Sequence, residues 1–114
     1  MKSITKEQEY FLYRFTRGTW ELNQETKLVD IDGAFNCSDQ NLPDFLGIEF
    51  GKIKNDFNCS HNKLVSLEGA PQEVGGYFNC SNNQLISLDG APKNIKYSFY
   101  CYNNKLVSLE GAPK

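Results

Sequence analysis

The stretches FNCSHNKLVSLEGAP (57–71), FNCSNNQLISLDGAP (78–92) and FYCYNNKLVSLEGAP (99–113) are copies of one short repeat. A more divergent copy, FNCSDQNLPDFLGIEFGKI (35–53), comes before them. The cysteines of successive copies are 22, 21 and 21 residues apart. A unit this short cannot bury its own apolar face, so neighbouring copies must stack into a solenoid with a continuous core.

The overall composition fits one globular domain of 114 residues. A net charge of −2 and a pI of about 5.3 provide no general attraction to nucleic acid or to an anionic membrane surface. No stretch approaches the roughly 20 apolar residues of a membrane span, and the first residues lack the apolar run of a signal peptide. We therefore expect a cytoplasmic protein with reduced thiols and with neither nucleic acid nor membrane as a partner.

Residues 1–30 do not repeat, and they contain a helix signal. Thr5 and Gln8 form a capping-box pattern that starts a helix. Phe11 and Phe15 lie four residues apart and give this helix an apolar face. The pair Arg17-Gly18 is expected to end it, with a cation in the last turn and a residue free to adopt positive φ.

A short hairpin is expected after the helix. Residues 20–22 and 28–31 alternate apolar and polar side chains around a polar turn at 23–27. A solenoid needs its ends covered, so residues 1–30 are interpreted as an N-terminal cap of helix and hairpin. The alternative is a partner-docking helix that exposes Phe11, Phe15 and Trp20.

Residues 31–114 form four repeats, which we divide as 31–52, 53–73, 74–94 and 95–114. Each is expected to contribute one short strand with the motif Phe-x-Cys, whose two side chains share a face. Gly-Ala-Pro corners stop any long helix, so the back of each coil should be extended or turn-like. The stacked apolar columns are Phe35/Phe57/Phe78/Phe99, Cys37/Cys59/Cys80/Cys101, Leu42/Leu64/Leu85/Leu106, Phe45/Leu67/Leu88/Leu109 and Ile31/Ile53/Val74/Ile95.

The motif Phe-x-Cys-x-x-Asn-x-Leu resembles the strand and turn of a leucine-rich repeat, with Phe and Cys in place of two leucines. The repeat consensus FNCSxNxLxSLxGAP more closely resembles a group of largely uncharacterised bacteriophage and bacterial repeat proteins, over about residues 30–114. The resemblance implies an α+β, leucine-rich-repeat-like curved parallel sheet whose inner face binds another macromolecule. It carries over no catalytic residues. For a phage-encoded protein it implies an inhibitor of a host immune protein, acting in the host cytoplasm.

The four cysteines invite metal and redox interpretations. Neighbouring strands are about 4.8 Å apart, and a straight row of thiols cannot converge on a tetrahedral zinc ion. A disulfide needs Cβ atoms about 3.8 Å apart with converging bonds, which parallel side chains on one face provide poorly. Inward cysteines act as small hydrophobic residues, so we expect neither metal nor cofactor, and Cys101 on the last strand should be the most reactive thiol.

The column Asn62, Asn83 and Asn104 is interpreted as structural. Its amides can bond backbone groups at the bend after each strand, where sheet pairing stops. Repeat one departs from the pattern, with Gln40 at the equivalent position and one residue inserted before Ile53. The turn of repeat one is therefore expected to be looser.

Alternation along the strands predicts an outer face that changes character in repeat four. Its positions are mostly small and neutral in repeats one to three, and include the serines 38, 60 and 81, whereas repeat four places tyrosines there. Tyrosine is a frequent anchor at protein interfaces, because it combines a large area with a polar tip. The alternative is that the tyrosines only cover an exposed edge. The predicted partner-binding residues are Tyr77, Tyr100, Tyr102, Asn58, Asn79 and His61.

No catalytic group is expected. His61 is the only histidine, and no repeated Ser, Cys or carboxylate accompanies it, so it is interpreted as a solvated loop residue. One carboxylate per coil recurs on the outside as a solvated column. Lys63 and Lys105 are too few to make a nucleic-acid groove with the tyrosines.

The last repeat is expected to have an open edge, with Phe99, Cys101, Leu106 and Leu109 covered on one side only. Open strand edges recruit another chain, so either a second copy in a two-fold homodimer or the partner should cover this C-terminal edge. The function predicted is a non-catalytic protein-binding module that acts through the strand face and the tyrosine-rich end. The alternative is a self-assembling structural protein whose partner is itself.

Overall fold

The computed structural model describes residues 3–112, and within them it contains one helix and eight strands. The elements are α1 (Lys6–Phe15), β1 (Thr16–Leu22), β2 (Val29–Asn36), β3 (Phe50–Ile53), β4 (Phe57–Asn58), β5 (Glu73–Val74), β6 (Phe78–Asn79), β7 (Asn94–Ile95) and β8 (Phe99–Tyr100).

Strand β2 is the strand that both ladders of the sheet share, because each of its halves pairs with a different later strand. Its first half pairs in parallel with β3 and its second half with β4. The order β7-β5-β3-β2-β4-β6-β8 therefore consists of two parallel ladders that share one strand. Strand β1 pairs antiparallel with β2 and lies outside these ladders.

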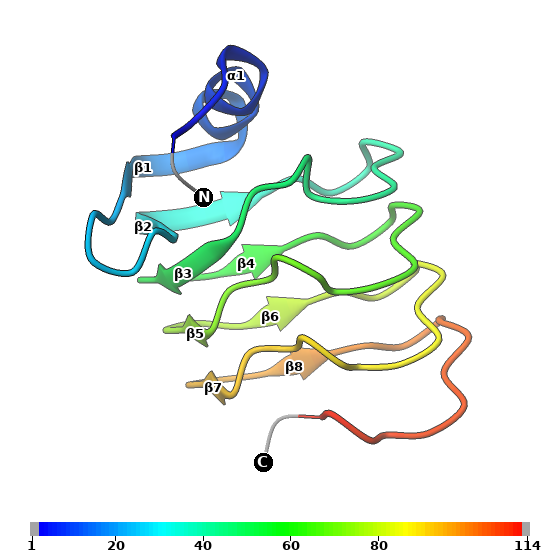
Figure 1. Cartoon of the computed structure of the whole chain (residues 1–114). Helices are drawn as coiled ribbons and strands as arrows, with labels where there is room; N and C mark the ends of the chain where they lie inside the picture. The colour runs from blue at the N-terminus through cyan, green and yellow to red at the C-terminus, as the bar shows by residue number, and fades with distance from the viewer. Residues whose placement is uncertain (1–2, 113–114) are drawn as a thin grey trace.

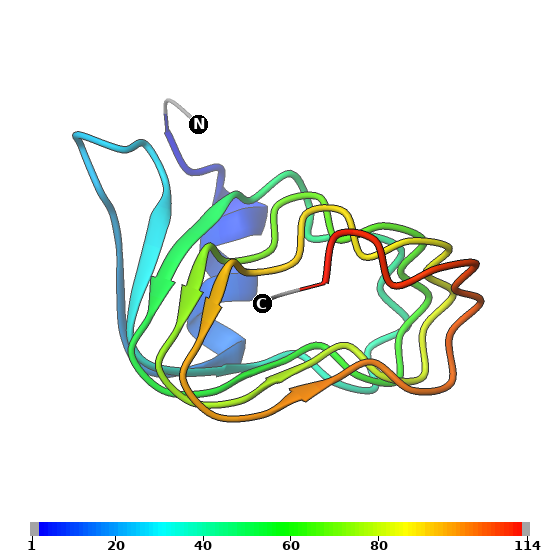
Figure 2. The same cartoon turned by 90° about the horizontal axis from the view of Figure 1, so that it is seen from below.

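The coils stack into a solenoid of about three turns, with α1 at the end formed by β1 and β2 (Figure 1). In Figure 2 the coils overlie one another, so that β3, β5 and β7 form one side and β4, β6 and β8 form the adjoining side. Strand-free segments return the chain along the remaining side. The predicted repeat solenoid with parallel strands and an N-terminal helix is confirmed.

The expectation of one short strand per repeat was wrong, because the coils contain two. The column that precedes each Phe-x-Cys motif also pairs, Ile53 with Val74 and Val74 with Ile95. Hydrogen bonding continues through the bend between the two strands, where Asn55 N–H donates to Gly33 O at 2.9 Å. The column is visible in the sequence, but a two-residue strand contains too little alternation to be recognised as one.

Phenylalanine rings stack along the axis of the core. The ring centroids of Phe35 and Phe57 are 5.4 Å apart, those of Phe57 and Phe78 are 5.6 Å apart, and those of Phe78 and Phe99 are 5.9 Å apart. Each fully buried Phe or Leu side chain contributes about 1.5–3 kcal/mol to folding. The leucines that pack around the rings and are fully buried are Leu64, Leu67, Leu85 and Leu88.

Repeat one accommodates both of its departures from the pattern. Its inserted residue is absorbed by a register shift between Val29 and Ile31 in the β2–β3 pairing. The backbone N–H of Gln40 donates to Asn62 Oδ1 at 3.0 Å, and that of Leu42 donates to the same oxygen at 2.9 Å. This turn is therefore bonded to the next coil, against the expectation of a looser one.

Helix α1 begins with the predicted capping box. Gln8 N–H donates to Thr5 Oγ1 at 3.1 Å, and Thr5 N–H donates to Gln8 Oε1 at 3.0 Å. The helix ends at Phe15, and β1 starts at the next residue. The expectation that Arg17-Gly18 would end the helix was therefore wrong, because this pair lies inside β1.

The predicted hairpin is confirmed and is longer than expected, since β1 follows β2 from Leu22 opposite Val29 to Thr16 opposite Phe35. Gly18 faces Gly33 in this pairing, and both have positive φ, 118° and 147°. A Cβ on either would overlap a carbonyl oxygen of the opposite strand. This glycine pair lets β1 remain bonded to β2 where β2 passes from one ladder to the other.

Helix α1 packs over the core at the β2 end of the stack. The Phe11 ring lies edge-on to Phe35 with 5.5 Å between centroids, and Gln8 Nε2 donates to Leu46 O at 2.9 Å. Phe11 is buried, and Phe15 and Trp20 pack partly buried against the core, so these side chains do not form an exposed docking face. Strand β2 crosses the expected boundary between residues 30 and 31, so the hairpin and the first coil share a strand.

Candidate functional site

Asn62, Asn83 and Asn104 form a hydrogen-bonded column along the stack. Each Nδ2 donates to the carbonyl oxygens of the cysteine in its own coil and of the cysteine in the preceding coil, at 3.0–3.1 Å. The Oδ1 of Asn83 accepts the Leu64 N–H of the preceding coil at 3.0 Å. The prediction that this column is structural is confirmed, and its polar atoms are used inside the fold.

The serines of repeats two and three are buried rather than exposed, which corrects the prediction that Ser60 and Ser81 point outward, whereas Ser38 is half-buried. Ser60 is 4% exposed and Ser81 is 0% exposed. Asn58 Oδ1 accepts both the backbone N–H and the hydroxyl of Ser60, at 2.9 and 2.7 Å. This turn bends the chain directly after the strand, so the strand alternation does not extend to the serine.

The cysteines lie in the core, as the packing interpretation predicts. Cys37, Cys59 and Cys80 are fully buried, whereas Cys101 is partly exposed. Burial raises the pKa of Cys37 and of Cys80 to about 12, and it raises the pKa of Cys59 well above its ordinary value. Burial also raises the pKa of Cys101. The three interior thiols are therefore protonated at neutral pH and shielded from reagents.

The structure brings two of the predicted tyrosines together on the outer face of the ladder β4–β6–β8. The rings of Tyr77 and Tyr100 meet edge-to-face, with 6.0 Å between centroids. Tyr100 is 41% exposed and Tyr102 is 56% exposed, while Tyr77 is half-buried. No hydrogen bond within residues 3–112 engages their hydroxyl groups, which leaves these groups available to a partner.

The other predicted partner-binding residues differ in how accessible they are. Asn58 and Asn79 are half-buried, and each Oδ1 accepts the N–H of the serine two residues later. His61 is exposed and adopts the left-handed conformation with φ 55°. The interpretation of His61 as a solvated loop residue is confirmed.

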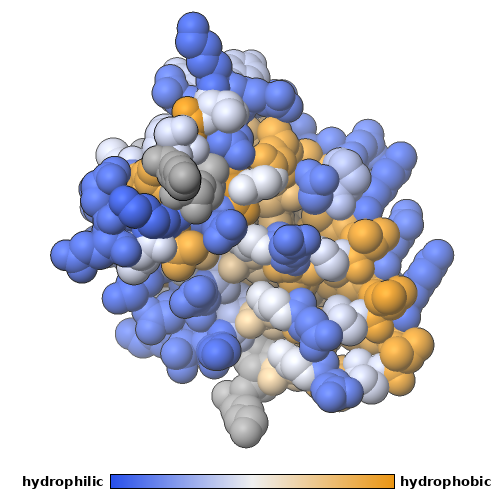
Figure 3. Space-filling model, in the orientation of Figure 1, coloured by the Kyte–Doolittle hydropathy of each residue, from blue (hydrophilic) through white to orange (hydrophobic). Residues whose placement is uncertain are grey.

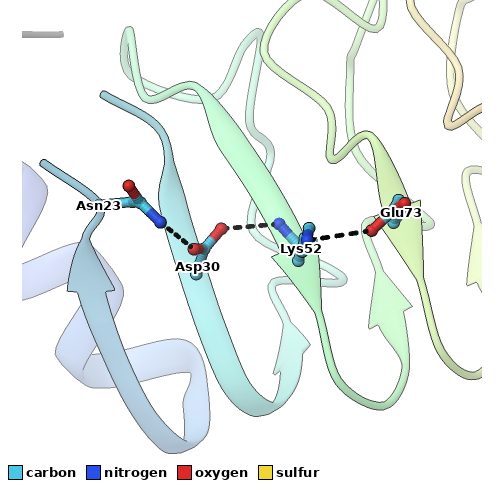
Figure 4. A network of polar contacts seen from close by, with 4 residues as sticks. All are labelled: Asn23, Asp30, Lys52 and Glu73. Atoms are coloured by element: carbon cyan, nitrogen blue, oxygen red, sulfur yellow. Dashed lines mark hydrogen bonds and ion pairs between the residues drawn. The ribbon is translucent and has the colours of Figure 1, made fainter. Parts of the chain in front are cut away.

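A chain of polar contacts crosses the outer face of the other ladder (Figure 4). Asn23 Nδ2 donates to Asp30 Oδ2 at 3.1 Å, and Lys52 N–H donates to Asp30 Oδ1 at 2.9 Å. Lys52 Nζ lies 3.8 Å from Glu73 Oε2, and both side chains are exposed. The face borders a hollow of about 850 Å³. The exposed Lys52–Glu73 pair contributes at most about 1 kcal/mol to stability. The two hydrogen bonds of Asp30 link β2 to Asn23 of the hairpin turn and to β3.

The sequence interpretation missed an exposed aliphatic column. Val65, Ile86 and Val107 occupy equivalent positions of three repeats and are 57%, 60% and 86% exposed. Figure 3 shows hydrophobic surface along the right-hand ends of the coils. The signal was present in the sequence, because an aliphatic residue directly follows the column leucine (Leu64, Leu85 or Leu106) in each of these repeats.

The last coil is less covered than the coil before it. Leu109 is 68% exposed, whereas the equivalent Leu88 is fully buried. Phe99, Cys101 and Leu106 are partly exposed, and no other part of residues 3–112 packs on their outer side. These four residues are the predicted C-terminal edge.

Other site types find no support in the part of the chain that the structure describes. Within residues 3–112, no three His, Cys, Asp or Glu side chains are grouped so that they could hold a metal ion. None of the described helical structure is long and apolar enough to cross a bilayer. Comparisons with protein-family models, with curated proteins and with solved structures give no significant match. The function is therefore inferred from the surfaces of this chain.

Proposed function

We propose that the protein is a non-catalytic module that binds a protein partner through the outer face of β4, β6 and β8. The observation that carries this proposal is the edge-to-face pair of the half-buried Tyr77 and the exposed Tyr100, with the exposed Tyr102 two residues further along the chain. Tyrosine side chains lose little conformational entropy when they are fixed in an interface, and they combine apolar area with a hydrogen-bonding tip.

The structure beneath this face favours partner binding over the alternative that the tyrosines only cover an exposed edge. Tyr77 and Tyr100 sit beside Phe78 and Phe99, whose rings stack inside the core, and both strands are held by ladder hydrogen bonds. A rigid support of this kind lowers the entropy cost of association. At the position of Tyr100 the three earlier repeats have asparagine, so the aromatic residue is not a requirement of the repeat.

Repeat-derived substitutions test the proposal while retaining the fold. Tyr100→Asn and Tyr102→Ser restore the residues of the earlier coils. The matched control is Tyr10→Asn with Tyr13→Ser, because these tyrosines are 63% and 77% exposed on α1. We expect the wild type and the control to capture the same partner. The variant with Tyr100→Asn and Tyr102→Ser should lose this partner or bind it with an affinity at least about tenfold lower. Equal binding by all three proteins would contradict the proposed face.

A more specific version, the inhibition of a host immune protein by a phage-encoded module, is supported by the sequence resemblance alone. Its test is whether the captured partner loses activity when the wild-type protein is added and keeps it with the double tyrosine variant.

A second candidate function is self-assembly, supported by the partial exposure of Phe99, Cys101, Leu106 and Leu109. In a homodimer through this edge, the mass measured by light scattering should rise towards twice the monomer mass as concentration increases. Leu109→Lys should abolish that rise, because it places a charge in the contact. A monomer mass throughout the micromolar range would contradict self-assembly.

A further inference from the structure

We propose that a hollow between the end of α1 and the outer face of β2 and β4 binds a carboxylate side chain of the protein partner. The inference rests on the proposed function and specifies the chemistry of one contact. The hollow has a volume of about 380 Å³. Arg14 and Arg17 line one side of it, Asp56 and Tyr77 line the other, and the small Ala34 lies between them.

The strand register explains why this space is open. Arg17 faces Ala34 across the β1–β2 hairpin, and the β2–β4 register places Asp56 on the far side of Ala34. The later repeats have larger side chains at the position of Ala34. Arg17 and Asp56 therefore lie on opposite sides of β2, and these two residues make no ion pair.

The two arginines determine which ligand the hollow can bind. Arg14 and Arg17 are the only two arginines in the chain, and both line this one hollow. Within residues 3–112, no hydrogen bond or ion pair engages either guanidinium. The Cζ of Arg14 lies 5.1 Å from the centroid of the Phe15 ring, a cation–π contact that restrains this side chain. An arginine presents a planar fork of donors that matches a carboxylate in bidentate geometry.

Two asparagines add further donors. Asn36 and Asn58 also line the hollow, and the Oδ1 atom of each is occupied by the N–H of the serine two residues later. Their Nδ2 groups have no partner within the described residues, so they can donate to an incoming oxygen. Asp56 accepts the Tyr77 N–H at 2.8 Å, which holds this carboxylate on the wall opposite the arginines. The ligand that fits is an acceptor-rich anionic group placed against Arg14 and Arg17.

Tyr77 connects the hollow to the proposed binding face. It lines the hollow and also contacts Tyr100 edge-to-face. The two sites are therefore continuous, and the partner surface they fit carries an acidic residue next to an aromatic or aliphatic contact. The local charge from the two arginines and Asp56 is opposite in sign to the net charge of −2 of the chain, so recognition by this hollow is local rather than a property of the whole surface.

The test uses the two arginine Nε–Hε signals of the ¹⁵N-labelled full chain. The probe is N-acetylglutamate N-methylamide, and the matched neutral probe is N-acetylglutamine N-methylamide. We expect the glutamate probe to give saturable shifts of both arginine signals and of the Ala34 and Asp56 amides at millimolar concentration, with none from the glutamine probe. Arg17→Gln should weaken the binding at least about fivefold. The control Lys63→Gln removes an exposed charge elsewhere and should leave the affinity unchanged.

Arg17→Lys provides a second variant that keeps the charge and removes the fork, and it should also weaken binding if the contact is bidentate. Equal shifts from the two probes, shifts that do not saturate, or an equal loss in Lys63→Gln and Arg17→Gln would overturn the inference. The proposed function is tested separately. If the glutamate probe fails to bind while the variant with Tyr100→Asn and Tyr102→Ser still loses its partner, the proposed function is supported and the carboxylate site is contradicted.

Discussion

The two ends of the solenoid present the same repeat columns to different surroundings. At the β2 end, Phe35 is covered by the rings of Phe11 and Phe15, and β1 pairs along the free edge of β2. At the other end, Phe78 is the only aromatic ring that pairs with Phe99 within residues 3–112, and β8 is the last strand of its ladder. Because Phe35 and Phe99 are the same residue type in the same column, a difference in stability between variants of the two measures what packing on the outer side of a coil contributes.

Stacking buries the apolar side chains of a coil fully only when another coil lies on each side of that coil. Leu67 and Leu88, with coils on each side, are fully buried, whereas Leu109 is 68% exposed. In repeat proteins, stability is approximately a sum of terms for each unit and for each interface, so the last coil should be held by one interface instead of two.

The largest effect is expected from truncation of matched phenylalanines at the two ends. Phe35→Ala removes a fully buried ring that contacts four other rings, and it should lower the free energy of unfolding by about 3–5 kcal/mol. Phe99→Ala removes a partly exposed ring and should cost less than about 2 kcal/mol. Urea denaturation of the two variants measures both values. Equal losses would mean that the first coil is no better covered than the last.

A smaller difference is expected between two asparagines of the structural column. Asn83→Ala leaves buried carbonyl and N–H groups without partners, at a cost of about 1–3 kcal/mol. Asn104 is partly exposed, so water can replace some of its contacts, and Asn104→Ala should cost less than about 1 kcal/mol. Thermal melting of both variants checks the order. An unchanged melting temperature for Asn83→Ala would contradict the buried column.

The smallest effect near neutral pH is expected from ionisation of the thiols, because it develops only in alkaline solution. The pKa of Cys59 is raised by burial above its ordinary value of 9.0, so the folded state holds this proton where the unfolded state has lost it. Its contribution to stability is therefore complete below about pH 9 and falls as pH rises above that, by up to about 1.4 kcal/mol per pH unit.

Denaturation of Cys59→Ala between pH 8 and pH 10.5 should accordingly show a shallower decline than the wild type. Cys101→Ala provides the comparison at the open end, where the thiol is partly exposed and the decline should change less. Identical slopes for the wild type and Cys59→Ala would show that this thiol is not shielded.

The repeat architecture could be predicted from the sequence because each column recurs at a fixed period. The apolar columns of Phe57 and Leu64, the column of Asn83 and the capping box at Thr5 all correspond to interactions that are local or that repeat in every coil. Patterns of this kind do not depend on knowledge of the whole fold.

The features that were missed depend on contacts that only the stacked fold creates. The second strand of each coil has two residues in β5 and in β7, which is too short for alternation to be read. Ser81 is buried because the chain bends after the strand, and alternation alone cannot locate that bend. The hollow beside Ala34 joins β1, β2 and the end of α1, so no single stretch of sequence carries its signal.

The most direct test of the central claim, that the coils stack in register behind a closed β2 end, is thiol labelling of the native protein. Iodoacetamide at pH 7.5, followed by mass spectrometry of the cysteine-containing peptides, gives a rate for each thiol. We predict that Cys101 reacts first, and that Cys37, Cys59 and Cys80 react at least about tenfold more slowly, through opening of the fold. Modification of Cys37 or Cys59 as fast as Cys101 would contradict the stacked arrangement.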